Sequence, residues 1–195
     1  MTKDMKRFLI AFAVLVGTAV ALSAQPRSAG LRIGAAGLDA VYQHSLSKNT
    51  FIEGNFGLDF GVKKNAGFKL TGIYNMVLAR PAWTDKGSWA IYAGPGVSLG
   101  NVYDMVKYDI MNKKMPFPDN GFMLALTGQV GLEYNFEFPL QIAVDLRPMI
   151  GLHVNDGKFR DPATNVLIEG YESKVGFYGN GLIGFIPNIS VRYRF

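Results

Sequence analysis

The chain has 195 residues, enough for one domain, and a formal net charge of +5. It has no long basic run, which argues against nucleic-acid binding, and no cysteine, which excludes a disulfide framework and a thiolate metal site. Its 23 glycines and 13% aromatic residues favour a β protein with tight turns over a helical bundle, because glycine destabilises helix interiors.

Residues 1–24 have the layout of a secretory signal peptide. A basic start precedes an uncharged apolar stretch from Phe8 to Leu22, and small residues then lead to Ala24. An uncleaved membrane anchor is the alternative, but this stretch is short for a spanning helix, which needs about 20 residues. We therefore expect cleavage after Ala24 and a single β-barrel domain over residues 25–195.

Alternation of apolar and polar residues predicts seven strands along the mature chain. They lie near residues 31–46, 51–61, 66–77, 88–101, 123–136, 139–153 and 174–195. The clearest pair, 123–136 and 139–153, exceeds the roughly 5–6 residues usual for soluble domains and reaches the roughly 9–11 residues that cross a bilayer. The pattern predicts an all-β, antiparallel up-and-down transmembrane β-barrel with its apolar side chains outside.

Seven strands do not close such a barrel, because bacterial single-chain barrels have an even number. The missing strand could lie in residues 26–40, where the phase of the alternation changes at the bulge or bend of "GAAG" (34–37), or in the final segment, where "GFIPN" (184–188) could be a turn. We predict about eight strands and leave the position of the eighth open. Pro95 and Pro148 interrupt predicted strands, so we expect a bulge or a rim position at each.

Residues 102–121 and 154–173 read as long polar loops. Exposed loops carry variable binding functions, so contact with a surface ligand is one interpretation, and solvated loops without a partner are the default. The sequence identifies no ligand for them.

The charged residues of the strands take the polar phase, which points into the barrel. We predict that they fill the lumen as an ion-pair network, since buried charges must be paired. A narrow solute channel is the alternative, which an eight-stranded barrel leaves little room for. The predicted lumenal residues are Glu53, Asp59, Lys69, Glu133, Asp145, Arg147, Arg192 and Arg194.

No catalytic, cofactor or metal site is predicted. The two histidines, His44 and His153, are the residues from which a lipid-modifying barrel enzyme could be built, and His44 is next to Ser45. Neighbouring strand residues point to opposite faces, so adjacency gives no nucleophile and base, and a hydrogen-bonded polar histidine is the simpler account.

The chain ends "NISVRYRF", in which Ile189, Val191, Tyr193 and Phe195 share one face and Arg192 and Arg194 the other. This last strand should pair with the first, because a bilayer offers no partner for open backbone groups.

Several pieces resemble a widespread family of small, uncharacterised outer-membrane β-barrel proteins of diderm bacteria. They cover most of the mature chain and read "LRIGAAGLDAVYQHSLSKNTFIEGNFG", "LTGIYN", "IYAGPGVSLG", "GQVGLEYNFEFPLQIAVDLRPMIGL" and "SVRYRF". The resemblance implies a barrel in the outer membrane, in contact with its lipid, but no biochemical activity. It also implies that Tyr193 and Phe195 form the terminal signal read by the barrel-assembly machinery. The longer 154–188 region departs from the family.

Two function classes follow. The first is a non-enzymatic outer-membrane barrel with a structural, surface-interaction or narrow-conduit role. The rival is a soluble, lipocalin-like barrel that binds an apolar ligand in the periplasm, and a lipid-A-modifying enzyme is a third possibility. The first two differ in which phase faces inward, because a soluble barrel would bury its leucines and valines.

Overall fold

The computed structural model describes residues 26–35, 37–59, 67–110, 113–155, 158–160, 167–169 and 175–195. For residues 59, 104–110, 113–119, 158–160 and 167–169 it describes the backbone alone. The predicted signal peptide, residues 1–24, lies outside the described residues.

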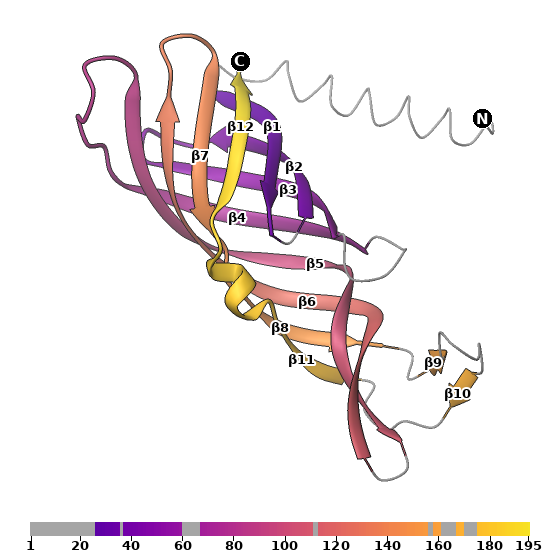
Figure 1. Cartoon of the computed structure of the whole chain (residues 1–195). Helices are drawn as coiled ribbons and strands as arrows, with labels where there is room; N and C mark the ends of the chain where they lie inside the picture. The colour runs from indigo at the N-terminus through magenta and orange to yellow at the C-terminus, as the bar shows by residue number, and fades with distance from the viewer. Residues whose placement is uncertain are drawn as a thin grey trace, which may run out of the picture.

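The chain forms a closed antiparallel β-barrel (Figure 1). Ten strands make one sheet, and four of them form two interrupted barrel strands: β7 with β8, and β11 with β12. Eight barrel strands therefore close the ring, with β12 returning to β1, as the sequence predicts. The elements are β1 (Arg27–Gly34), β2 (Gly37–Ser45), β3 (Thr50–Asp59), β4 (Gly67–Ala79), β5 (Ser88–Ile110), β6 (Lys113–Asn135), β7 (Leu140–Leu146), β8 (Met149–Val154), β9 (Lys158–Arg160), β10 (Leu167–Glu169), β11 (Val175–Gly179), a 3₁₀ turn η1 (Gly181–Phe185) and β12 (Asn188–Arg194).

The register fixes how steeply the strands tilt. Tyr193 pairs with Leu140 on one side. Followed the other way round the barrel, the same row of paired residues reaches Ile150, ten residues further along the β7–β8 strand. The row runs from Tyr193 through Ala29, Tyr42, Gly54, Gly72, Val97 and Leu126 to Ile150. This offset of ten residues is the shear of the barrel. With about 3.4 Å per residue and about 4.8 Å between strands, a shear of ten residues over eight strands tilts the strands by about 40° from the barrel axis, within the range of closed eight-stranded barrels.

Side-chain direction follows the predicted alternation. In β4 every second residue from Gly67 to Ile73 is buried while its neighbours are exposed. In β6 the outward Leu124 and Leu126 are 51% and 66% exposed, whereas the inward Met123 is buried. Apolar side chains therefore cover the outside, and the inside holds most of the charged ones.

The barrel strand whose position the sequence leaves open is β1, the first strand of the barrel. Residues 31–46 do not form the one strand that the sequence predicts; they hold the second half of β1 and the whole of β2, which pair antiparallel as far as Gly34↔Gly37. Gly37 takes a φ of 137°, which is strained for a residue with a side chain, so glycine permits the reversal. The phase change in the sequence is this reversal of direction.

The last barrel strand is interrupted by η1 instead of being divided by a hairpin. Gly179 pairs with Ile150 and Asn188 with Asp145, so the eight residues between these pairs on this strand face four on its neighbour, and four are extra. The excess is taken up by the segment that contains η1, whose Leu182 and Phe185 are exposed.

The two strand prolines behave differently. Pro148 lies at the break between β7 and β8, as expected for a residue that lacks a ladder donor. Pro95 is neither at a bulge nor at the rim, and this expectation was wrong. The β4–β5 register is the same at Ile73↔Gly96 and Met76↔Ala93, and the pairing between them is simply missing.

Residues 102–121 are not a loop. They continue β5 and β6 as a ladder that runs from Val102↔Gly121 to Ile110↔Lys113. Figure 1 shows this hairpin passing well beyond the other strands, at the end of the barrel opposite the C-terminus. Region 154–173 is also not wholly loop, because β9 and β10 form a separate two-stranded sheet there.

Both termini of the barrel and its three short connections lie at one end. The connections are residues 46–49, 80–87 and 136–139. We call this the terminal end, and the end with the long hairpin the hairpin end. No helix in the described parts of the chain is long and apolar enough to cross a membrane.

Candidate functional site

The lumen is filled by a network of ion pairs with two centres. In the first, Arg32 of β1 donates to Asp39 of β2 at 2.6 Å and, through two nitrogens, to Asp145 of β7 at 2.8 and 3.2 Å. Each of these side chains is almost fully buried. The two-nitrogen contact is the fork geometry that guanidinium groups favour with carboxylates.

Glu53 of β3 forms the second centre. Its carboxylate accepts from Arg147 at 2.6 Å and from Arg192 at 2.9 Å. Arg192 also lies 3.6 Å from Glu133. The two arginines come from neighbouring parts of the wall, because β12 pairs with β7, and through them this centre ties β3 to the closing strand β12 and to the break after β7.

The network is electrically balanced. Its cations are Arg32, Lys69, Arg147 and Arg192, and its anions are Asp39, Glu53, Glu133 and Asp145. Four positive charges thus face four negative ones. The longer contacts of Arg147 with Asp39 and Asp145, both at 3.8 Å, link the two centres, and Lys69 lies 3.9 Å from Asp39.

Six of the eight predicted lumenal residues meet in this network: Glu53, Lys69, Glu133, Asp145, Arg147 and Arg192. The side chain of Asp59 lies outside those described. Arg194 lies at the terminal end, where its guanidinium donates to the backbone carbonyls of Phe136 and Phe138.

Sequence reasoning missed Arg32 and Asp39. Treating residues 31–46 as one strand hid the fact that each lies between outward-facing neighbours. Arg32 stands between Leu31 and Ile33, a signal that two separate strands would have made readable.

Neutral polar side chains complete the filling. Thr71, Ser98 and Thr127 form a hydroxyl chain across β4, β5 and β6, with oxygen separations of 2.8 and 2.7 Å. Near it, Asn75 donates to Gln129 at 2.9 Å. The three hydroxyls bond to one another, whereas the buried Oδ1 of Asn75 has no partner among the described residues.

Apolar side chains occupy the lumen towards the hairpin end. Val102, Met123, Ala125, Met149 and Tyr178 form one buried cluster. Nearer the terminal end of the lumen, Tyr92 packs edge-on against Phe51 with 5.2 Å between ring centres. Gly131 makes room for Tyr92, because a Cβ at this position would meet the Tyr92 ring.

The two histidines lie far apart. His153 is buried in β8 with Nε2 3.1 Å from the carbonyl oxygen of Val102, towards the hairpin end. His44 pairs with Arg27, the first residue of β1, at the terminal end. Within the described part of the chain no three His, Cys, Asp or Glu side chains are grouped to hold a metal ion.

Aromatic rings line the outside near the terminal end. Neighbouring ring centres are 4.6–5.4 Å apart, and Tyr193 and Phe195 stack at 6.5 Å close by in the chain's last strand. The row runs through Trp83, Trp89, Tyr134, Phe136 and Phe138.

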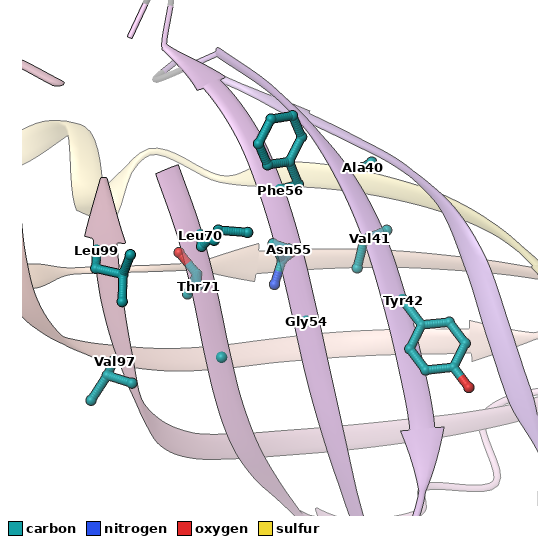
Figure 2. Close-up of a pocket in the computed structure, with 11 residues that line it drawn as sticks. Ala40, Val41, Tyr42, Gly54, Asn55, Phe56, Leu70, Thr71, Val97 and Leu99 are labelled. Atoms are coloured by element: carbon teal, nitrogen blue, oxygen red, sulfur yellow. The ribbon is translucent and has the colours of Figure 1, made fainter. Parts of the chain in front are cut away.

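An open groove of about 470 Å³ marks the outer wall across β2, β3, β4 and β5. Gly54 and Gly72 face each other at its floor, and a Cβ on either would meet nothing within 4 Å. Figure 2 shows Phe56 and Tyr42 on either side of Gly54. The groove is a dent made by small residues among exposed apolar ones.

The terminal strand closes the wall. Tyr193 pairs with Ala29 on one side and Leu140 on the other, and Phe195 and Arg27 exchange backbone hydrogen bonds of 2.9 and 3.2 Å. The expected pairing of the last strand with the first is confirmed. Tyr193 and Phe195 are both exposed on the outer face.

A polar mouth of about 210 Å³ opens at the terminal end. Arg27, Arg80 and Arg194 line it, together with Glu133 and several hydroxyl and amide side chains.

The comparisons with known proteins support the fold. No known protein family matches the chain, and no curated protein matches it in sequence. The structure is similar to the N-terminal β-barrel domain of Pseudomonas aeruginosa OprF, with a TM-score of 0.51, over 88% of this chain and 96% of that one. The identity of 12% means that this likeness shows an eight-stranded barrel architecture and nothing more specific.

Proposed function

We propose that the protein is an integral outer-membrane β-barrel with a sealed lumen and a non-enzymatic structural or surface-interaction role. The observation that carries this proposal is the direction of the side chains. Leucine, isoleucine, valine and aromatic residues face outward on every barrel strand, while paired charges fill the inside. A protein surrounded by water has no reason to expose so continuous an apolar surface.

The apolar band has the height of a bilayer. On β6 the outward residues are apolar or glycine from Phe122 to Tyr134. Twelve steps of about 3.3 Å at a tilt of about 40° span about 30 Å, the thickness of a hydrocarbon core. The aromatic row lies at the edge of this band nearest the terminal end, and membrane barrels carry an interfacial girdle at such an edge.

The ends of the barrel give its orientation. Outer-membrane barrels have short periplasmic turns and longer external loops. The terminal end would therefore face the periplasm, and the long β5–β6 hairpin would project outside the cell. A paired ribbon extending past the wall presents a surface for contact with an external partner, which supports the surface-interaction role.

The balanced lumen favours a structural role over a narrow conduit. Eight strands leave an interior that side chains can fill, and here ion pairs cross it from β3 to β12 and from β1 to β7. A solute would have to separate these pairs in a medium of low dielectric constant, at a large cost.

The soluble alternative fits less well. A lipocalin-like barrel would line its lumen with apolar side chains around a ligand, whereas the described lumen holds eight interacting charges. The enzymatic alternative lacks a combined site, because His44 and His153 lie towards opposite ends. The barrel-assembly machinery remains an expected partner through Tyr193 and Phe195, which are exposed on the closing strand.

Fractionation of cells expressing the full chain tests the proposal. We expect the protein in the outer-membrane fraction, resistant to carbonate and released by detergent, with a gel mobility that changes on heating. A known periplasmic protein and a known outer-membrane barrel serve as controls. Recovery in the soluble periplasmic fraction would overturn membrane insertion, and discrete conductance steps in a planar bilayer would overturn the sealed lumen.

A further inference from the structure

The polar mouth at the terminal end has a floor whose polar groups are already engaged. Ser28 donates to Gln141 at 2.9 Å, Gln141 donates to Asn135 at 3.1 Å, and Asn135 donates to Glu133 at 3.0 Å. Gln43 accepts from Arg192 at 2.6 Å from below. The floor is thus a chain of hydrogen bonds next to the lumenal network.

The charges around the mouth do not balance. Arg80 and Arg194 line it, and the carboxylate in the lining, that of Glu133, already lies 3.6 Å from Arg192 in the floor. The mouth therefore carries a local excess of positive charge, unlike the balanced lumen on the other side of its floor.

Two of the arginines contact only carbonyl oxygens. Arg80 donates through Nη2 to the Lys48 carbonyl at 2.6 Å, and Arg194 donates through Nη2 to the carbonyls of Phe136 and Phe138. Within the described part of the chain neither guanidinium has a carboxylate partner. The buried Nε of Arg194 has no hydrogen-bond partner there. Each guanidinium is held in place while further donors stay open.

We propose that this mouth binds a phosphate oxyanion. Guanidinium groups present donors in a fork that matches phosphate oxygens, and Arg80, just after β4, and Arg194 of β12 both line this mouth. The volume of about 210 Å³ is below the roughly 300–1,000 Å³ of sites for drug-sized ligands, so it suits a small anion or a single head group.

Two sources can supply such a group. One is free phosphate in solution, and the other is the phosphate of an anionic lipid, whose head group would lie at the level of the aromatic row. The chemistry that the mouth recognises is the same in both cases. Binding of free phosphate does not depend on the proposed membrane location, so the two proposals can fail separately.

Titration calorimetry with inorganic phosphate tests the site, using the whole chain folded in a zwitterionic detergent at constant ionic strength. We expect saturable binding of one phosphate per chain. Arg80→Gln and Arg194→Gln should each weaken it about tenfold, the loss expected for one hydrogen bond to a charged group. Lys86→Gln removes the same charge from the connection between β4 and β5 without touching the mouth lining, and should change affinity by less than about twofold.

The outcomes separate a built site from diffuse attraction. Absence of saturable binding, or an equal loss in Lys86→Gln and Arg80→Gln, would overturn the proposal. Arg80 is exposed, so its variant keeps the test valid if Arg194→Gln impairs folding. In nanodiscs, competition from phosphatidylglycerol but not phosphatidylcholine would identify the lipid head group as ligand, and unchanged phosphate binding would identify the free anion.

Discussion

Glu53→Gln is the sharpest perturbation of the lumenal network. The substitution keeps the size of the side chain and removes its charge. The Glu53 carboxylate accepts from Arg147 at 2.6 Å, from Arg192 at 2.9 Å and from Asn55 at 3.1 Å, and it is fully buried. In the variant the network would hold four cations and three anions.

The cost follows from the uncompensated charge. Removing one partner of a buried ion pair destabilises a protein by about 3–5 kcal/mol, because the remaining charge stays desolvated. Glutamine still offers an oxygen to the two arginines, so we expect a loss of about 3 kcal/mol in the free energy of unfolding, the lower end of that range. Glu137→Gln makes the same chemical change at an exposed position of the β6–β7 turn and should cost less than about 0.5 kcal/mol.

Urea unfolding of the protein in lipid vesicles measures this difference, with tryptophan fluorescence and heat-dependent gel mobility as two independent readouts. The double variant Glu53→Gln with Arg147→Gln restores charge balance, so its loss should fall short of the sum of the single losses by about 1–3 kcal/mol. A Glu53→Gln protein as stable as the wild type, or additive losses in the double variant, would refute the idea that charge pairing holds the lumen together.

Two further pairs of variants test packing and environment. Gly131→Ala places a Cβ against the Tyr92 ring and should lower the free energy of unfolding by about 1–3 kcal/mol in the same urea assay. Gly54→Ala points into open space on the outer wall and should be nearly neutral. Equal losses in the two variants would contradict the assignment of Gly131 to the inside of the barrel and Gly54 to the outside. Val130→Arg puts a charge within the outer apolar band and should lower the free energy of unfolding in vesicles by about 2–4 kcal/mol. Val175→Arg lies beyond the band and should lower it by at most about 1 kcal/mol. A Val130→Arg protein of unchanged stability would argue against a lipid-facing wall.

The alternation of side chains could be predicted because each residue of the barrel wall faces either the polar lumen or the apolar outside, and these two environments favour different residue types. Phase alone assigns Glu53, Glu133, Asp145 and Arg192 to the inward face, and in the structure each of these side chains is buried. The same logic cannot supply distances. Opposing strands bring Glu53 next to Arg192, 139 positions away in the chain, and only the closed register decides that contact.

The structural features that sequence reasoning missed lie where alternation no longer distinguishes the lumen from the outside of the barrel. The β5–β6 extension runs past the wall, so both faces of the ribbon meet similar surroundings and its residues need no alternation. The reversal at "GAAG" kept apolar residues on both sides of the turn and therefore looked like one bent strand. The 3₁₀ turn η1 keeps outward apolar residues, so the phase of the sequence appeared continuous through it.

The break in the wall and the lumenal network meet at Arg147. Pro148 removes a ladder donor here, and the neighbouring strand is diverted into η1. The Arg147 backbone instead donates to the Gly184 carbonyl at 2.9 Å and accepts from the Asn180 side chain at 2.8 Å, while Asn180 in turn accepts from the Met149 backbone at 2.8 Å. In a bilayer these backbone groups would have no other partners. The interruption thus satisfies the backbone locally and fixes Arg147 where its side chain reaches Glu53, so the irregular wall and the ordered lumen are parts of one structure.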